Sequence, residues 1–258
     1  MNELINIKIE NGIGHIILNR SNKLNALSRN LVEELQKALR VLENNNNVNV
    51  IILSGNGSSF CAGGDIQSMK ELKNPVEAAE WVEFVSGLTR QILELEKYVI
   101  AAVHGYAAGA GFSLALACDF IVAEKESKFA FSFSNIGLIP DLGLVKLLSE
   151  RISPPLLKEW ISSSKILTAE EALSNQIINR LAEEEVLKEA EKFAEFIVEG
   201  PLLANKYVKY LVNTASSISN ETALMQENTI QSILLQTNDH IEGISAFVEK
   251  RKASFKGY

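Results

Sequence analysis

Two glycine-rich segments carry the residues best suited to chemistry. The first, Phe60-Cys61-Ala62-Gly63-Gly64-Asp65-Ile66, lies between an expected strand and an expected helix. Because its side chains are small, a ligand can approach the main chain, and the N–H of Ala62 or Gly63 can donate to a substrate oxygen. The alternative is an ordinary turn in which Asp65 caps the next helix.

The second segment, Gly105-Tyr106-Ala107-Ala108-Gly109-Ala110-Gly111, runs directly into an apolar helix. Its N–H groups lie at the positive end of that helix, where a negatively charged ligand group is favoured. Close packing of a strand on a helix is the alternative explanation. A nicotinamide cofactor is disfavoured, because Leu114 stands where a dinucleotide-binding motif requires its third glycine.

Apolar periodicity predicts the elements that position these segments. Residues 5–10 and 14–18 are predicted strands joined by an Asn11-Gly12 turn, and Ser28 is expected to cap a helix with one apolar face. Further predicted strands cover residues 48–53, 99–103 and 120–123. One further predicted helix covers residues 76–96, and another follows Gly109-Ala110-Gly111 and runs through Ala117. This alternation of strand and helix is typical of parallel crossover units.

The second half of the chain has a different character. After Pro140, further prolines interrupt helical stretches, and from residue 183 onward the periodicity is helical. The uncharged run 99–118 superficially matches a membrane span. Its β-type beginning and its glycines favour a buried strand, a turn and a buried helix instead, so no membrane association is expected.

Composition limits the classes of function. A chain of 258 residues that is 47% hydrophobic and 22% charged is expected to form one substantial core. Its net charge of -7 disfavours nucleic-acid binding. Cys61 and Cys118 show no pairing pattern and no signal peptide precedes them, which indicates free thiols in a cytoplasmic protein. The three histidines are too widely spaced to form a metal cluster, so no metal is expected.

Taken together, the two segments and their order along the chain resemble the enoyl-CoA hydratase/isomerase family, also called the crotonase superfamily. The resemblance covers nearly the whole chain. It rests on Asn25-Ala26-Leu27, the segment 60–66, Ala101-Ala102-Val103-His104-Gly105 with Ala108-Gly109-Ala110-Gly111, Ala117-Cys118-Asp119, Ile136-Gly137-Leu138-Ile139-Pro140-Asp141, and the ending Ala246-Phe247-Val248-Glu249-Lys250-Arg251.

The resemblance implies an α/β fold in which residues 1–200 form a crotonase-like spiral of ββα units. Residues 201–258 would form a C-terminal α-helical region that serves oligomerisation or covers the substrate, with a homotrimer or a dimer of trimers as the assembly. It also assigns the oxyanion hole to the N–H groups of Ala62 and Ala110, where the oxygen of an acyl-CoA thioester becomes an enolate. One such fixed donor is typically worth on the order of 3 kcal/mol of the barrier.

Coenzyme A enters in this scheme as part of the substrate, and no separate cofactor is expected. The resemblance implies that it contacts Lys23, Leu24, Ala26, Ala62, Gly64, Asp65, Ile66, Phe247 and Lys250. Phe247 and Lys250 match positions that cover the nucleotide, in some members from a neighbouring subunit. Lysine suits a phosphate partner, although a solvated basic helix end is the alternative reading of Lys250.

The chain departs from the hydratase pattern at Ser113 and Phe133, which occupy positions where typical hydratases carry two glutamates. Neither side chain can act as a carboxylate base, so addition of water by the usual route is disfavoured. Asp141, directly after Pro140, matches the acid of members that shift double bonds, including the ring-opening isomerases of phenylacetyl-CoA breakdown. The alternative role for Asp141 is an N-cap of a helix over residues 142–148.

We therefore expect an enoyl-CoA isomerase in which Ala62, Ala110 and Asp141 are the catalytic residues. One carboxylate suffices, because it removes a proton α to the thioester and returns it at the γ carbon, or the reverse. The alternatives are an enoyl-CoA hydratase with a non-standard acid and base, and a catalytically silent acyl-CoA-binding protein. Whether Asp141 faces the acyl pocket or caps a helix in solvent distinguishes these hypotheses.

Overall fold

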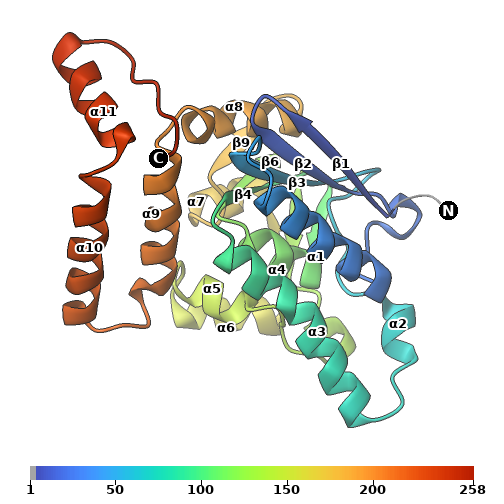
Figure 1. The fold of residues 1–258 in the computed structure, drawn as a ribbon. Coiled ribbons are helices and arrows are strands. Elements are labelled where there is room, and N and C mark those ends of the chain that lie inside the picture. Colours follow the sequence, from blue (N-terminus) through green and yellow to red (C-terminus); the bar gives the residue numbers. More distant parts are fainter. Residues whose placement is uncertain (1–3) are drawn as a thin grey trace.

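The computed structural model describes residues 4–258, and a six-stranded sheet in the order β1-β2-β3-β4-β6-β9 lies at its centre (Figure 1). β1 and β2 are antiparallel, whereas every neighbouring pair from β2 to β9 is parallel. A smaller sheet has the order β5-β7-β8. The strands are β1 (Ile5–Glu10), β2 (Ile13–Leu18), β3 (Val50–Gly55), β4 (Tyr98–Val103), β5 (Tyr106–Ala108), β6 (Phe120–Glu124), β7 (Lys128–Ala130), β8 (Ile166–Thr168) and β9 (Arg180–Ala182).

Helices cover both faces of the large sheet, because successive residues of its strands are apolar and point to opposite sides. Ile52 and Ala102 pack with Ala194 of α8 on one face, while Ile51 and Leu53 join the larger core under α1, α3 and α4 on the other. The helices are α1 (Arg29–Glu43), α2 (Ile66–Lys70), α3 (Pro75–Glu94), α4 (Ala110–Ala117), α5 (Leu144–Ser149), α6 (Pro154–Ser162), α7 (Ala169–Ser174), α8 (Val186–Val198), α9 (Leu202–Ala215), α10 (Asn220–Leu234) and α11 (Asn238–Glu249).

The longer elements agree with the prediction from sequence to within two residues at most of their ends. Asn11 and Gly12 both have positive φ in the predicted hairpin turn, and the Ser28 side chain accepts the N–H of Leu31 at the start of α1. In the run 99–118, β4 and α4 are the buried strand and helix that were predicted, whereas the expected glycine turn between them contains the short strand β5.

The prediction overlooked four short strands, β5, β7, β8 and β9, of three residues each. Three residues are too few to reveal an alternation of apolar and polar side chains. β7 is defined instead by its pairing with β5 and with β8, which are distant in sequence. The sequence predicted helical stretches after Pro140 and no strand at residues 166–168 or 180–182, so β8 and β9 were missed. From residue 183 onward the described elements are all helices, as predicted.

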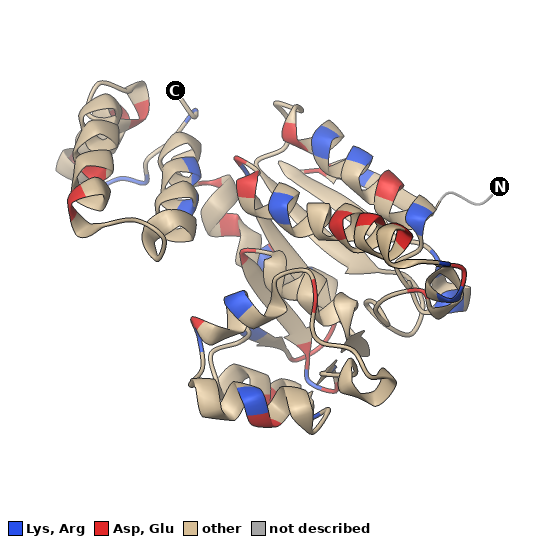
Figure 2. Cartoon of the chain, turned by 90° about the horizontal axis from the view of Figure 1, so that it is seen from below, with Lys and Arg blue, Asp and Glu red and all other residues tan. Residues whose placement is uncertain are grey.

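Charged side chains lie on the outer helices, with Lys and Arg interspersed among Asp and Glu (Figure 2). Within residues 4–258, no helix is both long enough and apolar enough to cross a membrane.

A buried ion pair connects the C-terminal helices α9–α11 to the rest of the molecule. Lys209 of α9 is only 3% exposed, and its Nζ donates to Asp119 Oδ2 and to the carbonyl oxygens of Ile92 and Lys97 at 2.8–2.9 Å. The same Asp119 oxygen also accepts the N–H of Val99. All three ammonium protons therefore have partners, which is the condition for burying a charge without a large penalty.

We predict that Lys209→Met lowers the free energy of unfolding by about 3–5 kcal/mol, because Asp119 is left buried without a counter-ion. The matched control is Lys206→Met, also on α9, whose ion pair with Glu96 is far more exposed and should contribute less than about 1 kcal/mol. Denaturant unfolding of both variants tests this. Equal losses would show that the buried pair does not anchor α9.

Candidate active site

The two glycine-rich segments lie side by side in the structure. The N–H of Cys61 donates to the Tyr106 carbonyl at 3.1 Å, and the N–H of Ala108 donates to the Cys61 carbonyl at 3.0 Å. These bonds form a parallel bridge between Cys61 and Ala107. The segment that follows β3 is thereby paired with β5, directly before the N-terminus of α4.

Glycine is required where the two segments touch. Gly63 has a φ of +100°, and a methyl group built on it would lie 2.6 Å from the Ala108 carbonyl oxygen and 3.3 Å from the Ala110 nitrogen. A methyl group on Gly111 would overlap the Cys61 carbonyl. Main chain therefore packs on main chain, which brings the N–H groups of both segments to one place.

Asn25 joins a third segment, residues 20–27, to this junction. Its side chain is fully buried, and Nδ2 donates to the carbonyl oxygens of Asn56, Ser59 and Phe60 at 2.9–3.1 Å. Its Oδ1 accepts the N–H of Arg20. In the sequence Asn25 was visible only as part of a family motif, because its partners lie more than thirty residues away.

The N–H groups near Ala62 differ in whether they are free to bind a ligand. The N–H of Ala62 donates to the Leu24 carbonyl at 2.9 Å, so the donor that the sequence analysis assigned to the oxyanion is already occupied. The N–H of Gly63 is directed at the Cys61 sulfur. Among the described residues, the N–H groups of Gly64 and Ala110 have no hydrogen-bond acceptor. The N–H groups available here for a ligand oxygen are therefore those of Gly64 and Ala110, and not that of Ala62.

Asp65 has a structural role. It is the N-cap of α2, where Oδ1 accepts the N–H groups of Gln67 and Ser68, and its Oδ2 forms an ion pair with Arg20 at 2.5 Å. Burial alone would raise the pKa of Asp65, but these bonds outweigh it and the pKa is lowered. The alternative prediction, that the Asp65 side chain caps a helix, is confirmed. Only the main chain of Asp65 therefore remains available to a ligand.

Ser113 and Phe133 both lie beside the second segment. Ser113 is fully buried in α4, and its Oγ donates to the Gly109 carbonyl within the same helix at 3.4 Å. A methyl group built on Gly109 would lie 3.9 Å from the Phe133 ring, which is 6% exposed. The surroundings of the Ala110 N–H therefore contain a self-satisfied hydroxyl and an aromatic ring at these two positions.

Asp141 carries a carboxyl group that has no structural partner. The helix that follows, α5, begins at Leu144 with Gly143 as its N-cap and no side-chain capping bond, so the helix-cap alternative is wrong for Asp141. Its Oδ1 is buried and, among the described residues, accepts no hydrogen bond. Burial raises the pKa of Asp141 to about 6, and a bond from its own N–H offsets only part of that shift. No hydrogen bond or ion pair joins it to Gly64 or Ala110 within residues 4–258.

Cys61 and the histidines offer little further chemistry. Burial raises the pKa of the Cys61 thiol to about 12, so it stays protonated and packs as a small apolar group. Within residues 4–258, no cluster of three or more His, Cys, Asp or Glu side chains is arranged to hold a metal ion.

The expected coenzyme A contacts fall into two separate groups. Lys23, Leu24 and Ile66 are exposed beside the first segment, and Ala26 and Gly64 are partly accessible there. Phe247 and Lys250 lie on α11, on the opposite side of the same chain (Figure 1). One chain therefore does not bring the two groups together.

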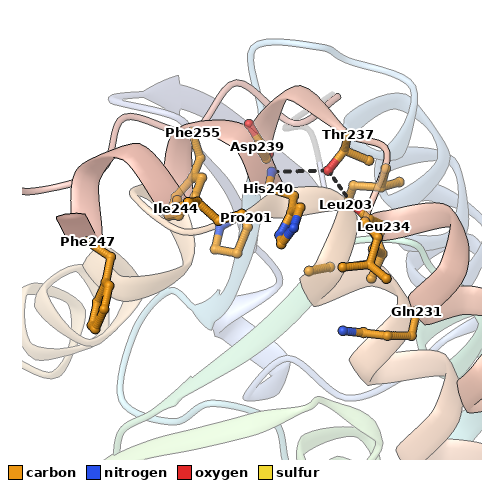
Figure 3. A pocket seen from close by; sticks show the side chains of 13 residues that line it. Pro201, Leu203, Gln231, Leu234, Thr237, Asp239, His240, Ile244, Phe247 and Phe255 are labelled. Atoms are coloured by element: carbon orange, nitrogen blue, oxygen red, sulfur yellow. Dashed lines mark hydrogen bonds between the residues drawn. The ribbon is translucent and has the colours of Figure 1, made fainter.

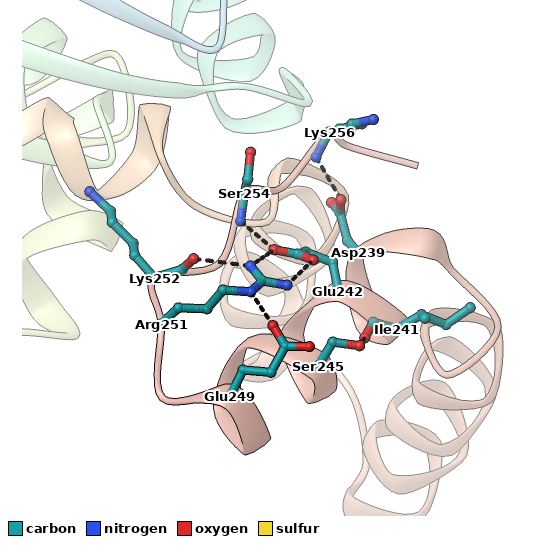
Figure 4. Close-up of polar contacts among 9 residues, drawn as sticks. All are labelled: Asp239, Ile241, Glu242, Ser245, Glu249, Arg251, Lys252, Ser254 and Lys256. Atoms are coloured by element: carbon teal, nitrogen blue, oxygen red, sulfur yellow. Dashed lines mark hydrogen bonds and ion pairs between the residues drawn. The ribbon is translucent and has the colours of Figure 1, made fainter.

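The α11 residues have surroundings of their own. Phe247 is 85% exposed and lines an apolar cavity of about 430 Å³ between α9, α10 and α11 (Figure 3). Lys250 ends α11 in a left-handed conformation. The next residue, Arg251, binds Glu242 and Glu249 and holds the final segment against the helix (Figure 4).

Comparison with known proteins decides the family. The model of the family described as Enoyl-CoA hydratase/isomerase matches residues 8–258. This chain belongs to the enoyl-CoA hydratase/isomerase family.

Its relatives differ in the reaction that they are named for. The chain is similar to the mitochondrial enoyl-CoA hydratase of Pongo abelii (34% identity, covering 95% of this chain and 84% of the relative) and to the 1,2-epoxyphenylacetyl-CoA isomerase of Escherichia coli (31%, covering all of both). A crystal structure of an enoyl-CoA hydratase subunit from Geobacillus kaustophilus is 35% identical, covers 99% of each chain and superposes with a TM-score of 0.93. The predicted crotonase-type α/β fold is confirmed.

We predict that Gly63→Ala and Gly64→Ala have very different effects. At Gly63, positive φ and the Ala108 carbonyl leave no room for a methyl group, so unfolding free energy should fall by about 2–3 kcal/mol. At Gly64, the added methyl group meets only the flexible end of Met69, and the loss should stay below about 1 kcal/mol.

Thermal unfolding and binding of an acyl-CoA to each variant check this prediction. Equal stability of the two variants would contradict the close contact between Gly63 and the Ala108 carbonyl.

Proposed function

We propose that this chain is an enoyl-CoA double-bond isomerase that acts through a thioester enolate. The observation that carries the proposal is the carboxyl group of the half-buried Asp141, whose buried Oδ1 has no partner among the described residues and whose pKa is raised to about 6. The positions of the two hydratase glutamates hold Ser113 and Phe133 instead. One proton carrier without a second carboxylate suits a proton shift better than addition of water.

The reaction would begin with transfer of a proton from the α or γ carbon of the acyl group to the Asp141 carboxylate. The electron pair of the broken C–H bond moves toward the thioester, whose oxygen becomes negative and accepts the N–H groups of Gly64 and Ala110. Asp141 then returns the proton at the other carbon, and the double bond has moved. Atoms and charge balance without a separate cofactor.

A raised pKa makes the Asp141 carboxylate a stronger base than an ordinary one while leaving it mostly ionised at neutral pH. The Phe133 ring, the Ser113 hydroxyl bonded within its own helix and the Ser132 hydroxyl lie around Gly109, and none of these groups is a carboxylate. Without a carboxylate at these positions no group there can act as a base toward an attacking water, which favours isomerisation over hydration.

Hydration is the second candidate, because several similar proteins are named hydratases. In this chain it would require Asp141, or a residue outside the two usual positions, to orient the water. A catalytically silent acyl-CoA-binding protein is the outcome if neither reaction is found.

We further propose that the chain assembles as a homotrimer or a dimer of trimers through residues 201–258. Helices α9–α11 expose a series of large apolar side chains that a monomer would leave in water. These are Val208, Val212, Leu224, Met225, Ile244, Phe247 and Val248. Assembly would also allow Phe247 and Lys250 of one copy to reach coenzyme A bound near Lys23, Leu24, Ala26, Gly64 and the main chain of Ala62, Asp65 and Ile66 in another.

Asp141→Asn is expected to lower the rate of isomerisation of a 3-enoyl-CoA, and of deuterium exchange from solvent, by about 10²–10⁴-fold. Binding of the acyl-CoA should persist, because the proposed coenzyme A contacts lie elsewhere. In the wild type, kcat/KM should fall about tenfold per pH unit below about pH 6, since only the ionised carboxylate accepts a proton. Unchanged exchange in the variant would overturn the role of Asp141.

The same variant also tests the surroundings of the carboxyl group. A pKa raised from 3.8 to about 6 means that the folded protein holds this proton more tightly than the unfolded chain, so its stability falls as pH rises through that window. Asp141→Asn should therefore raise the free energy of unfolding at pH 8 by on the order of 1–3 kcal/mol, and the gain should vanish below about pH 4. Destabilisation at pH 8 would contradict this.

Val212→Asp in α9 is expected to shift the assembly toward monomers, because it places a charge on the exposed apolar surface. Val76→Asp in α3 is the matched control, since Val76 is 66% exposed and Val212 69%. Light scattering of both variants measures the mass. A wild type that is monomeric at micromolar concentration would contradict the proposed assembly.

A further inference from the structure

The chain around Asp141 makes an unusual turn. Leu142 has a φ of +49° and Gly143 a φ of +81°, so two consecutive residues adopt the left-handed conformation. The N–H of Leu144 closes the turn on the Asp141 carbonyl at 3.2 Å. For leucine this conformation costs on the order of 1 kcal/mol or more, and it persists only where neighbouring groups hold it.

Two features hold this turn: the Leu142 side chain, which is buried in the core, and Thr89 of α3. The Thr89 side chain is 93% buried, and its Oγ1 donates to the Leu142 carbonyl at 2.8 Å. Its methyl group faces Gly143, where an added Cβ would lie 3.3 Å away. One side chain thus contacts both left-handed residues from a helix more than fifty residues earlier in the chain.

The direction of the Asp141 side chain depends on this turn, because little else holds the carboxyl group. Its Oδ1 has no partner within the part of the chain that the structure describes. No charged side chain contributes to its pKa, which burial raises and its own N–H lowers. The main chain of residues 141–143 therefore sets where the carboxylate points, and Thr89 bonds this main chain at the Leu142 carbonyl.

We propose that Thr89 is a positioning residue, which keeps the Asp141 carboxylate in the orientation that buries Oδ1 by donating a hydrogen bond to the Leu142 carbonyl. The inference rests on the proposed role of Asp141 as the proton carrier. Without the Thr89 hydroxyl, the turn can relax and Oδ1 of Asp141 can reach water.

Thr89→Val removes the hydroxyl with little change of shape, and Thr89→Ser keeps the hydroxyl and removes the methyl group. We expect Thr89→Val to lower kcat for isomerisation by about 10–100-fold with KM within about twofold, because small misplacement of a catalytic group is costly. The acid limb of the pH profile should move from about 6 toward the ordinary value of 3.8. Thr89→Ser should restore kcat to within about threefold of the wild type.

Ser127→Ala is the matched control, because the fully buried Ser127 hydroxyl also donates to a main-chain carbonyl, that of Val103, at 2.9 Å. It should lower the melting temperature like Thr89→Val but leave the acid limb in place. Should Thr89→Val fail to fold, Thr89→Ala replaces it. The pKa of Asp141, followed by carboxyl ¹³C NMR against Asp141→Asn, gives a readout that does not require activity.

The outcomes separate the two proposals. If Asp141→Asn abolishes exchange but Thr89→Val changes neither kcat nor the pKa of Asp141, the positioning role is wrong and the isomerase proposal stands. If Asp141→Asn leaves exchange intact, the isomerase proposal fails, while a lowered pKa of Asp141 in Thr89→Val would still show that Thr89 holds the carboxyl group.

Discussion

The contact of main chain with main chain between the two glycine-rich segments is the constraint on which the site depends. Residues 60–64 follow β3 and residues 105–111 follow β4, and the carboxyl ends of neighbouring parallel strands meet at one edge of a sheet. The Cys61–Ala107 bridge and the absence of side chains at Gly63 and Gly111 then bring two sets of N–H groups together. Asn25 fixes the third segment against them.

In a site built in this way, main-chain N–H groups would bind the oxyanion, whereas side chains would carry out the proton transfers. Main-chain donors require no particular side chain beyond small size, so they can serve any reaction that passes through a thioester enolate. The side chains nearby decide which reaction follows. In this chain Ser113 and Phe133 lie beside Gly109, and the carboxyl group that we propose as the proton carrier is that of Asp141, whose turn Thr89 of α3 contacts.

The C-terminal helices α9–α11 are held to the rest of the molecule by a buried ion pair, yet they expose many apolar side chains to solvent. Lys209 anchors α9 to Asp119 through a fully bonded, buried charge pair. The outer sides of α9–α11 nevertheless expose apolar side chains, and Phe247 is almost entirely uncovered. This arrangement is what a rigid element that mediates contacts between subunits would require, because its position must be set before its apolar surface is covered.

The sequence by itself determined the family and the long strands and helices, and it has Ser113 and Phe133 at the positions that the resemblance assigns to the hydratase carboxylates. Those features depend on local periodicity or on the identity of single residues, such as Ser113 and Phe133, and both can be read along the chain. The three-residue strands, the engagement of the Ala62 N–H by Leu24 and the buried state of Asp141 were decided only by the tertiary structure. Each of them depends on a partner brought close by folding, and neither the burial of a carboxyl group nor the availability of an N–H is a property of neighbouring residues in the sequence.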